Sequence, residues 1–313
     1  MKVFAERGNF SKTREDMNKL KTSWYPGHMA RAFSVFKREI KKAHVTIEVL
    51  DARIPLASRN KNIKRVSENQ NKIVILNKSD LVPADYLKRW QNAIAEKEGA
   101  RVICASLSAD RGAAKKILAC LDDLRKDILA RRTRGLAILN PVLRIVIIGI
   151  PNVGKSTLIN KLCGFNRTRV GKRPGITMGQ QWIAFGNNYE LLDMPGILEP
   201  DLDNAETADK LSMTYAISDK VTDPYLVSSR LIEILKRICG FNKPDFKHPF
   251  FKEEIQKAQD ADETLAMLAR HFNFYLQSKA VDYHRTACKL LKDYRDGLMG
   301  KFILDDINDL VER

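Results

Sequence analysis

The stretch GIPNVGKST, from Gly149 to Thr157, decides the fold that this sequence predicts. It has the phosphate-loop pattern, it directly follows the apolar run Leu143–Ile148, and it opens a predicted helix over Thr157–Cys163. Strand, glycine-rich loop and helix form the context in which this motif holds phosphates, because backbone N–H groups at a helix N-terminus point at the anion. The sequence therefore predicts a P-loop nucleotide-binding fold.

Individual residues of this loop have separate expected roles. Lys155 can reach the β and γ phosphates, which makes it a candidate catalytic residue, and the Ser156 hydroxyl can bind Mg²⁺. The other loop residues that we expect to contact the nucleotide are Asn152, Val153, Gly154 and Thr157. The side-chain oxygen of Asn152, together with phosphate oxygens, could also coordinate K⁺ and so add positive charge beside the transferred phosphate. The alternative is that Asn152 only shapes the loop.

Two further motifs select the base. NKSD, from Asn77 to Asp80, follows the apolar run Ile73–Leu76. An Asp80 carboxylate can accept two hydrogen bonds from guanine, from N1–H and the 2-amino group, and adenine lacks both donors. We expect Asn77 to tether the loop and the stem of Lys78 to cover the base. ASLS, from Ala105 to Ser108, follows the next strand-like run, and its residues Ser106 and Leu107 suit a loop whose backbone contacts the guanine oxygen.

The remaining motifs suit the switches of a GTPase. DMPG, from Asp193 to Gly196, follows the run Glu190–Leu192. Asp193 can hold Mg²⁺ through a water molecule, and the Gly196 N–H can bind the γ phosphate. Thr177, about 20 residues past the P-loop, is the candidate switch threonine for Mg²⁺ and γ phosphate, and hence a candidate catalytic residue. The alternative for Thr177 is an ordinary loop threonine.

Motif order and periodicity predict the architecture. Strand-like runs alternate with helix-length stretches, which favours a doubly wound, mostly parallel α/β sheet with ligands beyond the carboxyl ends of its strands. The five runs are Val45–Leu50, Ile73–Leu76, Arg101–Ala105, Leu143–Ile148 and Glu190–Leu192. The base motifs precede the phosphate motif, whereas conventional GTPases run from phosphate to base, so we predict a circular permutation.

Beyond about Pro200 the strand-like runs largely vanish, and apolar residues repeat at helical spacing. These residues are Leu226, Leu231, Leu235 and Ile238, then Leu265, Leu268 and Phe272. We therefore expect three parts: an N-terminal extension over 1–23, a circularly permuted GTPase domain over 24–199, and an α-helical C-terminal domain over 200–313 that binds RNA or the ribosome.

Composition narrows the partners. The net charge of +16 favours a polyanion, and no acidic residue lies between Asp127 and Glu190. The ten basic residues of that interval are Arg131, Arg132, Arg134, Arg144, Lys155, Lys161, Arg167, Arg169, Lys172 and Arg173.

The five cysteines include no Cys-x-x-Cys pair, so a disulfide framework or zinc ribbon is not expected. No apolar run reaches the roughly 18 residues of a membrane span. Residues 1–23 carry six basic but also three acidic residues, a weak match to a mitochondrial presequence.

The motif order resembles that of the circularly permuted YlqF/YawG GTPases. WYPGHMARA (Trp24 to Ala32), DARIP (Asp51 to Pro55) and SRN (Ser58 to Asn60) are similar to the N-terminal signatures of that family, although Lys61 stands where the family usually has proline. DYRDGLMGKFILDD, from Asp293 to Asp306, resembles the tail of the mitochondrial ribosome-assembly members.

The resemblance implies a GTPase that binds GTP and GDP and assists maturation of the large ribosomal subunit through its rRNA and proteins. It also implies a mitochondrial matrix location, with peripheral inner-membrane association or a cytoplasmic location as alternatives. Related GTPases with an asparagine like Asn152 depend on K⁺. Ile197 stands where many GTPases orient water with glutamine, and the family's candidate for that role is His28 of PGHM; the alternative is a structural or surface histidine.

Two other functions remain open at this point. One is a GTP-gated RNA-binding placeholder whose hydrolysis is incidental. The other is a permuted GTPase of the small subunit, but relatives of that kind carry an N-terminal OB barrel or zinc-binding cysteines, and this sequence shows neither pattern.

Overall fold

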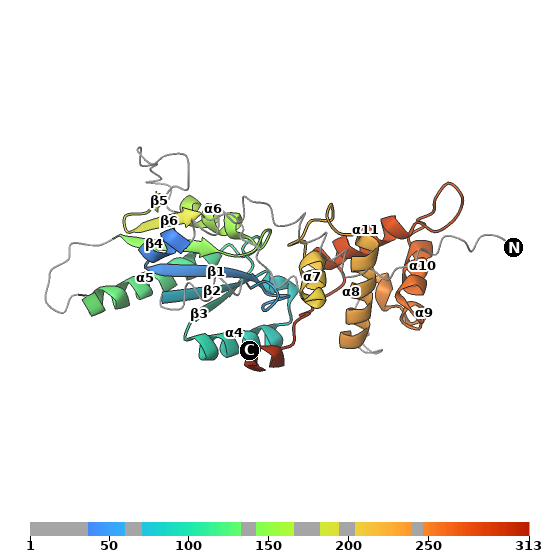
Figure 1. Cartoon of the computed structure of the whole chain (residues 1–313), viewed down its shortest axis with the longest axis horizontal. Helices are drawn as coiled ribbons and strands as arrows, with labels where there is room; N and C mark the ends of the chain where they lie inside the picture. Colours follow the sequence, from blue (N-terminus) through green and yellow to red (C-terminus); the bar gives the residue numbers. More distant parts are fainter. Residues whose placement is uncertain are drawn as a thin grey trace.

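The computed structural model describes residues 37–59, 71–132, 142–165, 182–193, 204–239 and 247–312. A six-stranded sheet forms one half of the molecule and helices form the other (Figure 1). The strand order is β3-β2-β1-β4-β6-β5, and every neighbouring pair is parallel except β5 with β6. The strands are β1 (Val45–Asp51), β2 (Asn71–Asn77), β3 (Arg101–Ala105), β4 (Leu143–Ile148), β5 (Trp182–Phe185) and β6 (Tyr189–Asp193). The predicted fold class, a mostly parallel α/β sheet with a helical C-terminal region, is confirmed.

Both faces of the sheet are covered, which explains why its central strands are apolar without interruption. Side chains alternate between the faces of a strand, so Ile73 and Ile75 of β2 pack in one cluster and Val74 and Leu76 in another. The first cluster includes side chains from α5 (Ala113–Arg132) and α6 (Lys155–Phe165). The second includes Trp90 from α4 (Ala84–Glu98).

The edge strand β5 was not predicted. It has only four residues, and it pairs antiparallel with β6 across a turn that contains Gly186, at a φ of 59°. A Gly-Asn-Asn sequence between two apolar runs is a signal for a hairpin, so the sequence did carry the information. The predicted run Glu190–Leu192 lies within β6.

The helical half begins after β6. Its elements are α7 (Ala205–Met213), α8 (Pro224–Cys239), η4 (Pro249–Phe251), α9 (Glu253–Gln256), α10 (Ala261–His271), α11 (Tyr283–Arg295) and α12 (Asn308–Glu312). Of the apolar residues that repeat at helical spacing, Leu231, Leu235, Leu265 and Leu268 are buried, whereas Ile238 is 41% exposed on the last turn of α8. Val227 is buried on α8 instead. None of the helices in the described ranges is long and apolar enough to cross a membrane.

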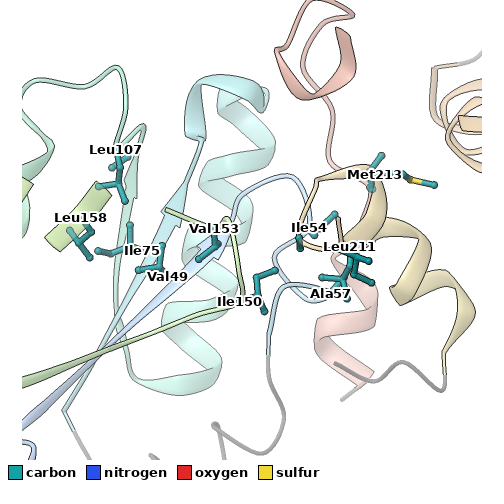
Figure 2. Close-up of a cluster of buried hydrophobic side chains, with 14 of the residues drawn as sticks. Val49, Ile54, Ala57, Ile75, Leu107, Ile150, Val153, Leu158, Leu211 and Met213 are labelled. Atoms are coloured by element: carbon teal, nitrogen blue, oxygen red, sulfur yellow. The ribbon is translucent and has the colours of Figure 1, made fainter. Parts of the chain in front are cut away.

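A continuous apolar cluster joins the two halves. Figure 2 shows Ile54, Ala57 and Ile150 of the sheet half beside Leu211 and Met213 of α7, and all five belong to the same buried cluster. The end of the chain returns to the sheet half as well, because Leu310 of α12 packs in the cluster that contains Trp90. The helical half is thus packed directly against the loops at one edge of the sheet.

Candidate nucleotide-binding site

The loops that carry the nucleotide motifs emerge at one edge of the sheet. β1 is parallel to β2 and to β4 and lies between them, so the loops after Asn77 and Ile148 leave at the same carboxyl edge. The end of β3 at Ala105 lies beside Asn77 in register. On the other side, Asp193 at the end of β6 is in register with Ile147. Motifs that are far apart in the sequence are therefore brought together where ligands bind in such sheets.

Asn77 connects the phosphate loop with both base loops. Its Nδ2 donates to the Val153 carbonyl at 2.6 Å, and its Oδ1 accepts from the Leu107 N–H at 2.9 Å. Gly154 lies against this side chain with a φ of 111°, and a Cβ on that residue would stand 2.2 Å from Asn77 Nδ2. Only glycine fits there. The buried Asn77 amide thus fixes the spacing between phosphate loop and base loops.

Within the phosphate loop, Lys155 is buried and its Nζ donates to the Ile150 carbonyl at 2.9 Å. Ser156 and Thr157 are exposed in the first turn of α6. Asn152 has a φ of 57°, and its Nδ2 donates to the carbonyl of Tyr215 at 2.8 Å. That hydrogen bond uses the amino end of the Asn152 amide, so the Oδ1 is the end available for a cation.

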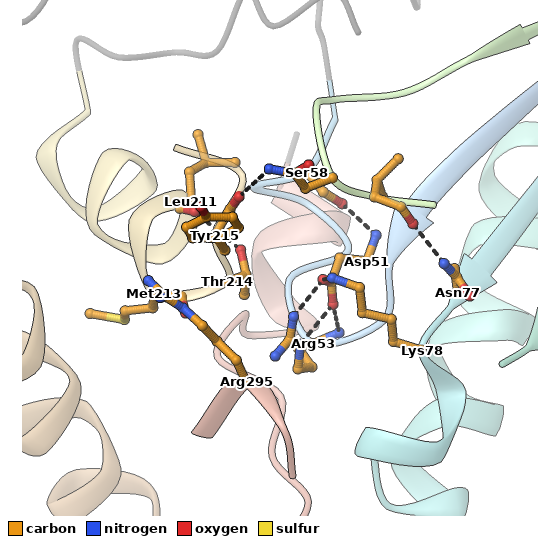
Figure 3. Close-up of polar contacts among 12 residues, drawn as sticks. Asp51, Arg53, Ser58, Asn77, Lys78, Leu211, Met213, Thr214, Tyr215 and Arg295 are labelled. Carbon is orange, nitrogen blue, oxygen red and sulfur yellow. Dashed lines mark hydrogen bonds and ion pairs between the residues drawn. The ribbon is translucent and has the colours of Figure 1, made fainter. Parts of the chain in front are cut away.

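On the base side, Asp80 is exposed in the short helix η2 (Ser79–Leu81), while Lys78 before it adopts a left-handed conformation with a φ of 60°. Lys78 Nζ donates to Asp51 Oδ2 at 2.8 Å, as Figure 3 shows. Asp51 comes from the end of β1, so the neighbouring strand holds the lysine that we expect to cover the base.

Asp51 in turn forms a bidentate ion pair with Arg53. The Arg53 Nε donates to Asp51 Oδ1 at 3.0 Å and its Nη2 to Oδ2 at 2.8 Å, with both side chains buried. Burial alone would raise the pKa of the Asp51 carboxyl, but the charges of Arg53 and Lys78 outweigh it and hold that pKa well below its usual range. Burial lowers the pKa of the Lys78 ammonium, and the Asp51 carboxylate opposes this. The carboxylate is ionised throughout the ordinary pH range and fixes the position of Lys78.

The second base loop is largely buried. Leu107 is packed in the core and its N–H already donates to Asn77. Ser106 is also buried, and its Oγ accepts from the Ala109 N–H at 3.4 Å. Buried contacts therefore hold this loop beside the NKSD motif.

Several predicted residues lie outside the described residues: His28, Thr177, Gly196 and the switch cations Arg167, Arg169, Lys172 and Arg173. The described part of the acid-free interval is not a free positive surface. Arg144 Nε lies 3.0 Å from Glu190 Oε2, and Lys161 Nζ donates to the Asp110 carbonyl.

The contacts from the helical half were missed by sequence reasoning. The Tyr215 carbonyl meets Asn152, and within the helical half Arg295 at the end of α11 holds the segment before it by donating to the Met213 and Ser212 carbonyls and to Asp219. The ring of Tyr294 lies 5.4 Å from the Arg53 guanidinium carbon. The sequence contained DARIP and DYRDG as separate stretches, but their spacing of more than 200 residues gave no sign that they meet.

A carboxylate near the chain end completes this junction. Asp305 Oδ2 accepts from the N–H groups of Leu56 and Ala57 at 2.7 and 3.0 Å, and its Oδ1 accepts from Lys210 of α7 at 3.0 Å. The buried Asp305 side chain therefore holds the loop after β1, the helix α7 and the C-terminal segment together.

Comparison with known proteins agrees with this geometry. A family model described as 50S ribosome-binding GTPase matches residues 144–246. Ribosome biogenesis GTPase A of Bacillus cereus is 34% identical over 295 residues, which cover 93% of this chain and 95% of the relative. The chain belongs to the circularly permuted YlqF-type GTPases. It therefore binds and hydrolyses GTP.

Two further relatives of this GTPase are informative. Short integuments 2, mitochondrial, of Arabidopsis thaliana is 31% identical, over 92% of this chain and 90% of the relative. The crystal structure of GNP-bound YlqF from T. maritima superposes with a TM-score of 0.61 at 25% identity, over 87% of this GTPase and 99% of that chain.

Proposed function

We propose that this GTPase is an assembly factor of the large ribosomal subunit, which binds the immature particle in the GTP-bound form and leaves after hydrolysis. The observation that carries the proposal is the junction at Asn77. One buried amide holds the phosphate loop to both base loops, in a chain that aligns nearly end to end with a protein named Ribosome biogenesis GTPase A.

In this proposal the exposed Asp80 reads the guanine donors, and Lys78, held by Asp51, covers the base. Leu107 and Ser106 form the wall beside it. The phosphates lie against the loop from Asn152 to Thr157, where Lys155 exchanges its contact with the Ile150 carbonyl for phosphate oxygens.

Metal ions complete the phosphate side. Ser156, Thr177 and Asp193 would hold Mg²⁺, since hydroxyl and carboxylate oxygens suit this hard cation. Ser156 is exposed in the first turn of α6, which follows β4, and Asp193 ends the neighbouring strand β6. Mg²⁺ supplies charge neutralisation for the phosphates. Asn152 Oδ1 would hold K⁺, which would add positive charge beside the phosphates.

Water positioning falls to His28, because Ile197 cannot hydrogen-bond water. The helical half, over residues 200–313, would contact rRNA and proteins of the subunit. The mitochondrial relative supports a mitochondrial location, and we place this GTPase in the matrix. Subcellular fractionation of the tagged full chain tests this. Matrix protein should appear in the soluble fraction of ruptured mitochondria, whereas protein that a carbonate wash releases from the membrane fraction would be peripheral on the inner membrane.

Single-turnover hydrolysis with purified ribosomal particles tests the function. We expect large subunits to accelerate GTP hydrolysis by this chain and small subunits to leave it unchanged. His28→Ala should lower the stimulated rate by roughly 10- to 100-fold without changing nucleotide affinity. Binding to large subunits with no acceleration would instead indicate an RNA-binding placeholder, and no binding to either subunit would contradict the proposal.

A further inference from the structure

A formed β-hairpin joins α10 to α11 and projects from the helical half, away from the sheet (Figure 1). Tyr275 and Val281 form an antiparallel bridge, and the Leu276 N–H donates to the Ala280 carbonyl at 2.8 Å. Lys279 closes the turn with a φ of 62°, and its N–H donates to the Leu276 carbonyl at 2.9 Å. The tip is therefore held by its own backbone hydrogen bonds and presents its side chains in a defined arrangement.

Large side chains at this tip face solvent. Tyr275 is 47% exposed and Leu276 is 51% exposed. Behind them, the Phe274 ring packs on the Phe272 ring with centroids 5.5 Å apart. The Arg285 guanidinium lies over the Phe274 ring, 4.1 Å from its centroid. The Phe274 ring thus supports an arginine plane, and the residue that follows Phe274 in the chain is the exposed Tyr275.

The cations of this surface lack acidic partners. Among the described residues, no carboxylate lies within ion-pair distance of Lys279, Arg285 or Lys292. Arg285 and Lys292 are both exposed on α11 and seven residues apart, which places them on one face of the helix.

Three carboxylates around this surface already accept hydrogen bonds, while the exposed Asp296, four residues after Lys292, forms no ion pair with it among the described residues. Asp282 caps the helix at the Arg285 N–H, and Asp262 accepts from the Tyr225 hydroxyl. Asp293 is buried with His248 and Lys289. The surface therefore combines uncompensated positive charge with exposed aromatic rings.

We propose that this hairpin and the adjoining face of α11 bind single-stranded RNA. The Tyr275 ring and the Arg285 plane stack on unpaired bases, while Lys279 and Lys292 pair with phosphates. Stacking of bases on aromatic and guanidinium planes, with cations along the backbone, is how proteins hold unpaired RNA. A membrane fits less well, because the tip offers only one large aliphatic side chain and no broad apolar helical face. The inference rests on the proposed function in that the RNA would be ribosomal.

Fluorescence anisotropy on the full chain tests this, with a labelled 12-nucleotide single-stranded RNA and the same sequence as a duplex. We expect the single strand to bind more tightly than the duplex. Tyr275→Ala should weaken single-strand binding by about 5-fold or more, and Tyr275→Phe should restore it, since stacking needs only the ring. Lys279→Ala combined with Lys292→Ala should reduce the dependence of affinity on salt.

Tyr86→Ala is the matched control. Tyr86 is a 50% exposed tyrosine on α4 with the Arg89 guanidinium carbon 5.7 Å from its ring, but it lies in the sheet half. The control should bind RNA like the unmodified chain. Unchanged affinity in Tyr275→Ala, or equal losses in both tyrosine variants, would overturn the inference.

Two parallel measurements separate the remaining explanations. Vesicles of anionic lipid replace RNA in the first. If Tyr275→Ala and Leu276→Ala abolish vesicle binding and leave RNA affinity intact, the hairpin binds a membrane and the inference is overturned.

In the second, the same variants are sedimented with large ribosomal subunits. If the unmodified chain fails to bind subunits while the hairpin binds RNA, the proposed function fails and this inference stands. If it binds subunits and Tyr275→Ala binds both subunits and RNA equally well, only the inference fails.

Discussion

Cations at the sheet edge and cations at the α10–α11 hairpin behave in opposite ways. At the sheet edge, Arg53 is only 2% exposed and Lys78 is largely covered, and both are bonded to Asp51. At the hairpin, Lys279 and Arg285 are exposed, and Arg285 rests on an aromatic ring instead of a carboxylate. The net charge of +16 is therefore not one property of the surface. The buried Arg53 and Lys78 hold the loops at the nucleotide edge, whereas Lys279 and Arg285 are exposed at the hairpin, where they can meet a polyanion.

Helix α11 joins these two regions. It has 13 residues, a length of about 20 Å at the usual rise per residue. Its first turn follows the hairpin. Its last turn carries Tyr294, whose ring lies beside the Arg53 guanidinium. It also carries Arg295, which donates to the carbonyls of Ser212 and Met213, just before Tyr215. Tyr215 accepts the hydrogen bond from Asn152 of the phosphate loop. A rigid element thus connects the proposed RNA surface with the nucleotide edge.

The largest effect on stability should come from breaking the buried ion pair between Arg53 and Asp51. Arg53→Met leaves the Asp51 carboxylate buried with Lys78 alone, so the free energy of unfolding should fall by about 3–5 kcal/mol in urea titrations. The matched control is Arg230→Met. Arg230 is 60% exposed and pairs with Glu233 on the surface, so its loss should change stability by less than about 1 kcal/mol. Equal effects in the two variants would contradict the distinction between buried and exposed cations.

Asp80→Asn should affect the ligand and not the fold. The exposed side chain should lose guanine nucleotide affinity by about 100-fold, because an amide presents a donor to guanine's donors. Xanthosine nucleotides should gain affinity, since the amide pairs with their carbonyl. Nucleotide titration by calorimetry measures both, with exposed Asp85→Asn in the first turn of α4 as control. Unchanged GTP affinity in Asp80→Asn would refute the base assignment.

The cation dependence of hydrolysis sharpens the role of the phosphate loop. We expect GTP hydrolysis to be roughly 10-fold faster in K⁺ than in Na⁺, as positive charge beside the phosphates stabilises the transition state. Asn152→Ala should abolish that difference while GTP still binds. Rates that are indifferent to the cation in the unmodified chain would exclude K⁺ at this asparagine.

The smallest effect concerns a buried histidine of the helical half. His248 Nδ1 accepts from the Phe250 N–H, so its Nε2–H donates to Asp293 at 3.1 Å. Burial lowers the pKa of His248 below its ordinary value of about 6.5, and Asp293 only partly offsets this. The unfolded chain then takes up a proton that the folded chain does not, so stability should fall as the pH drops from about 7 to 5.

His248→Gln should flatten this dependence, with a difference on the order of 1 kcal/mol or less in unfolding experiments at the two pH values. Stability of the unmodified chain that rises toward pH 5 would show that the sign is wrong. A profile in His248→Gln that matches the unmodified chain would assign the dependence to other groups.

Local pattern predicted much of the fold and of the candidate site. Each of the five apolar runs lies in a strand, because a strand covered on both faces needs unbroken apolar sequence. The motifs NKSD and GIPNVGKST lie at one edge because parallel strands bring their carboxyl ends together. The short edge strand β5 was missed because its four residues carry little periodicity, although the Gly-Asn-Asn turn after it was a signal for a hairpin.

Contacts between distant segments could not be predicted in the same way. Asp305 accepts the N–H groups of Leu56 and Ala57, almost 250 residues away in the chain. We expected the stem of Lys78 to cover the base, but its ion-pair partner Asp51 stood out only as part of the family signature DARIP. Such pairs depend on how whole elements pack, and no local spacing encodes them. Ile238 shows the same limit within one helix, since helical spacing places a residue on a stripe but does not show where the packing partner ends.

The coupling between nucleotide edge and RNA surface is tested most directly by co-sedimentation with purified large ribosomal subunits, in a non-hydrolysable GTP analogue and in GDP, at two salt concentrations. Binding should be tighter with the GTP analogue and should weaken steeply at the higher salt, because cations release counterions from rRNA phosphates. Equal binding in the two nucleotide states would contradict the coupling between nucleotide edge and RNA surface.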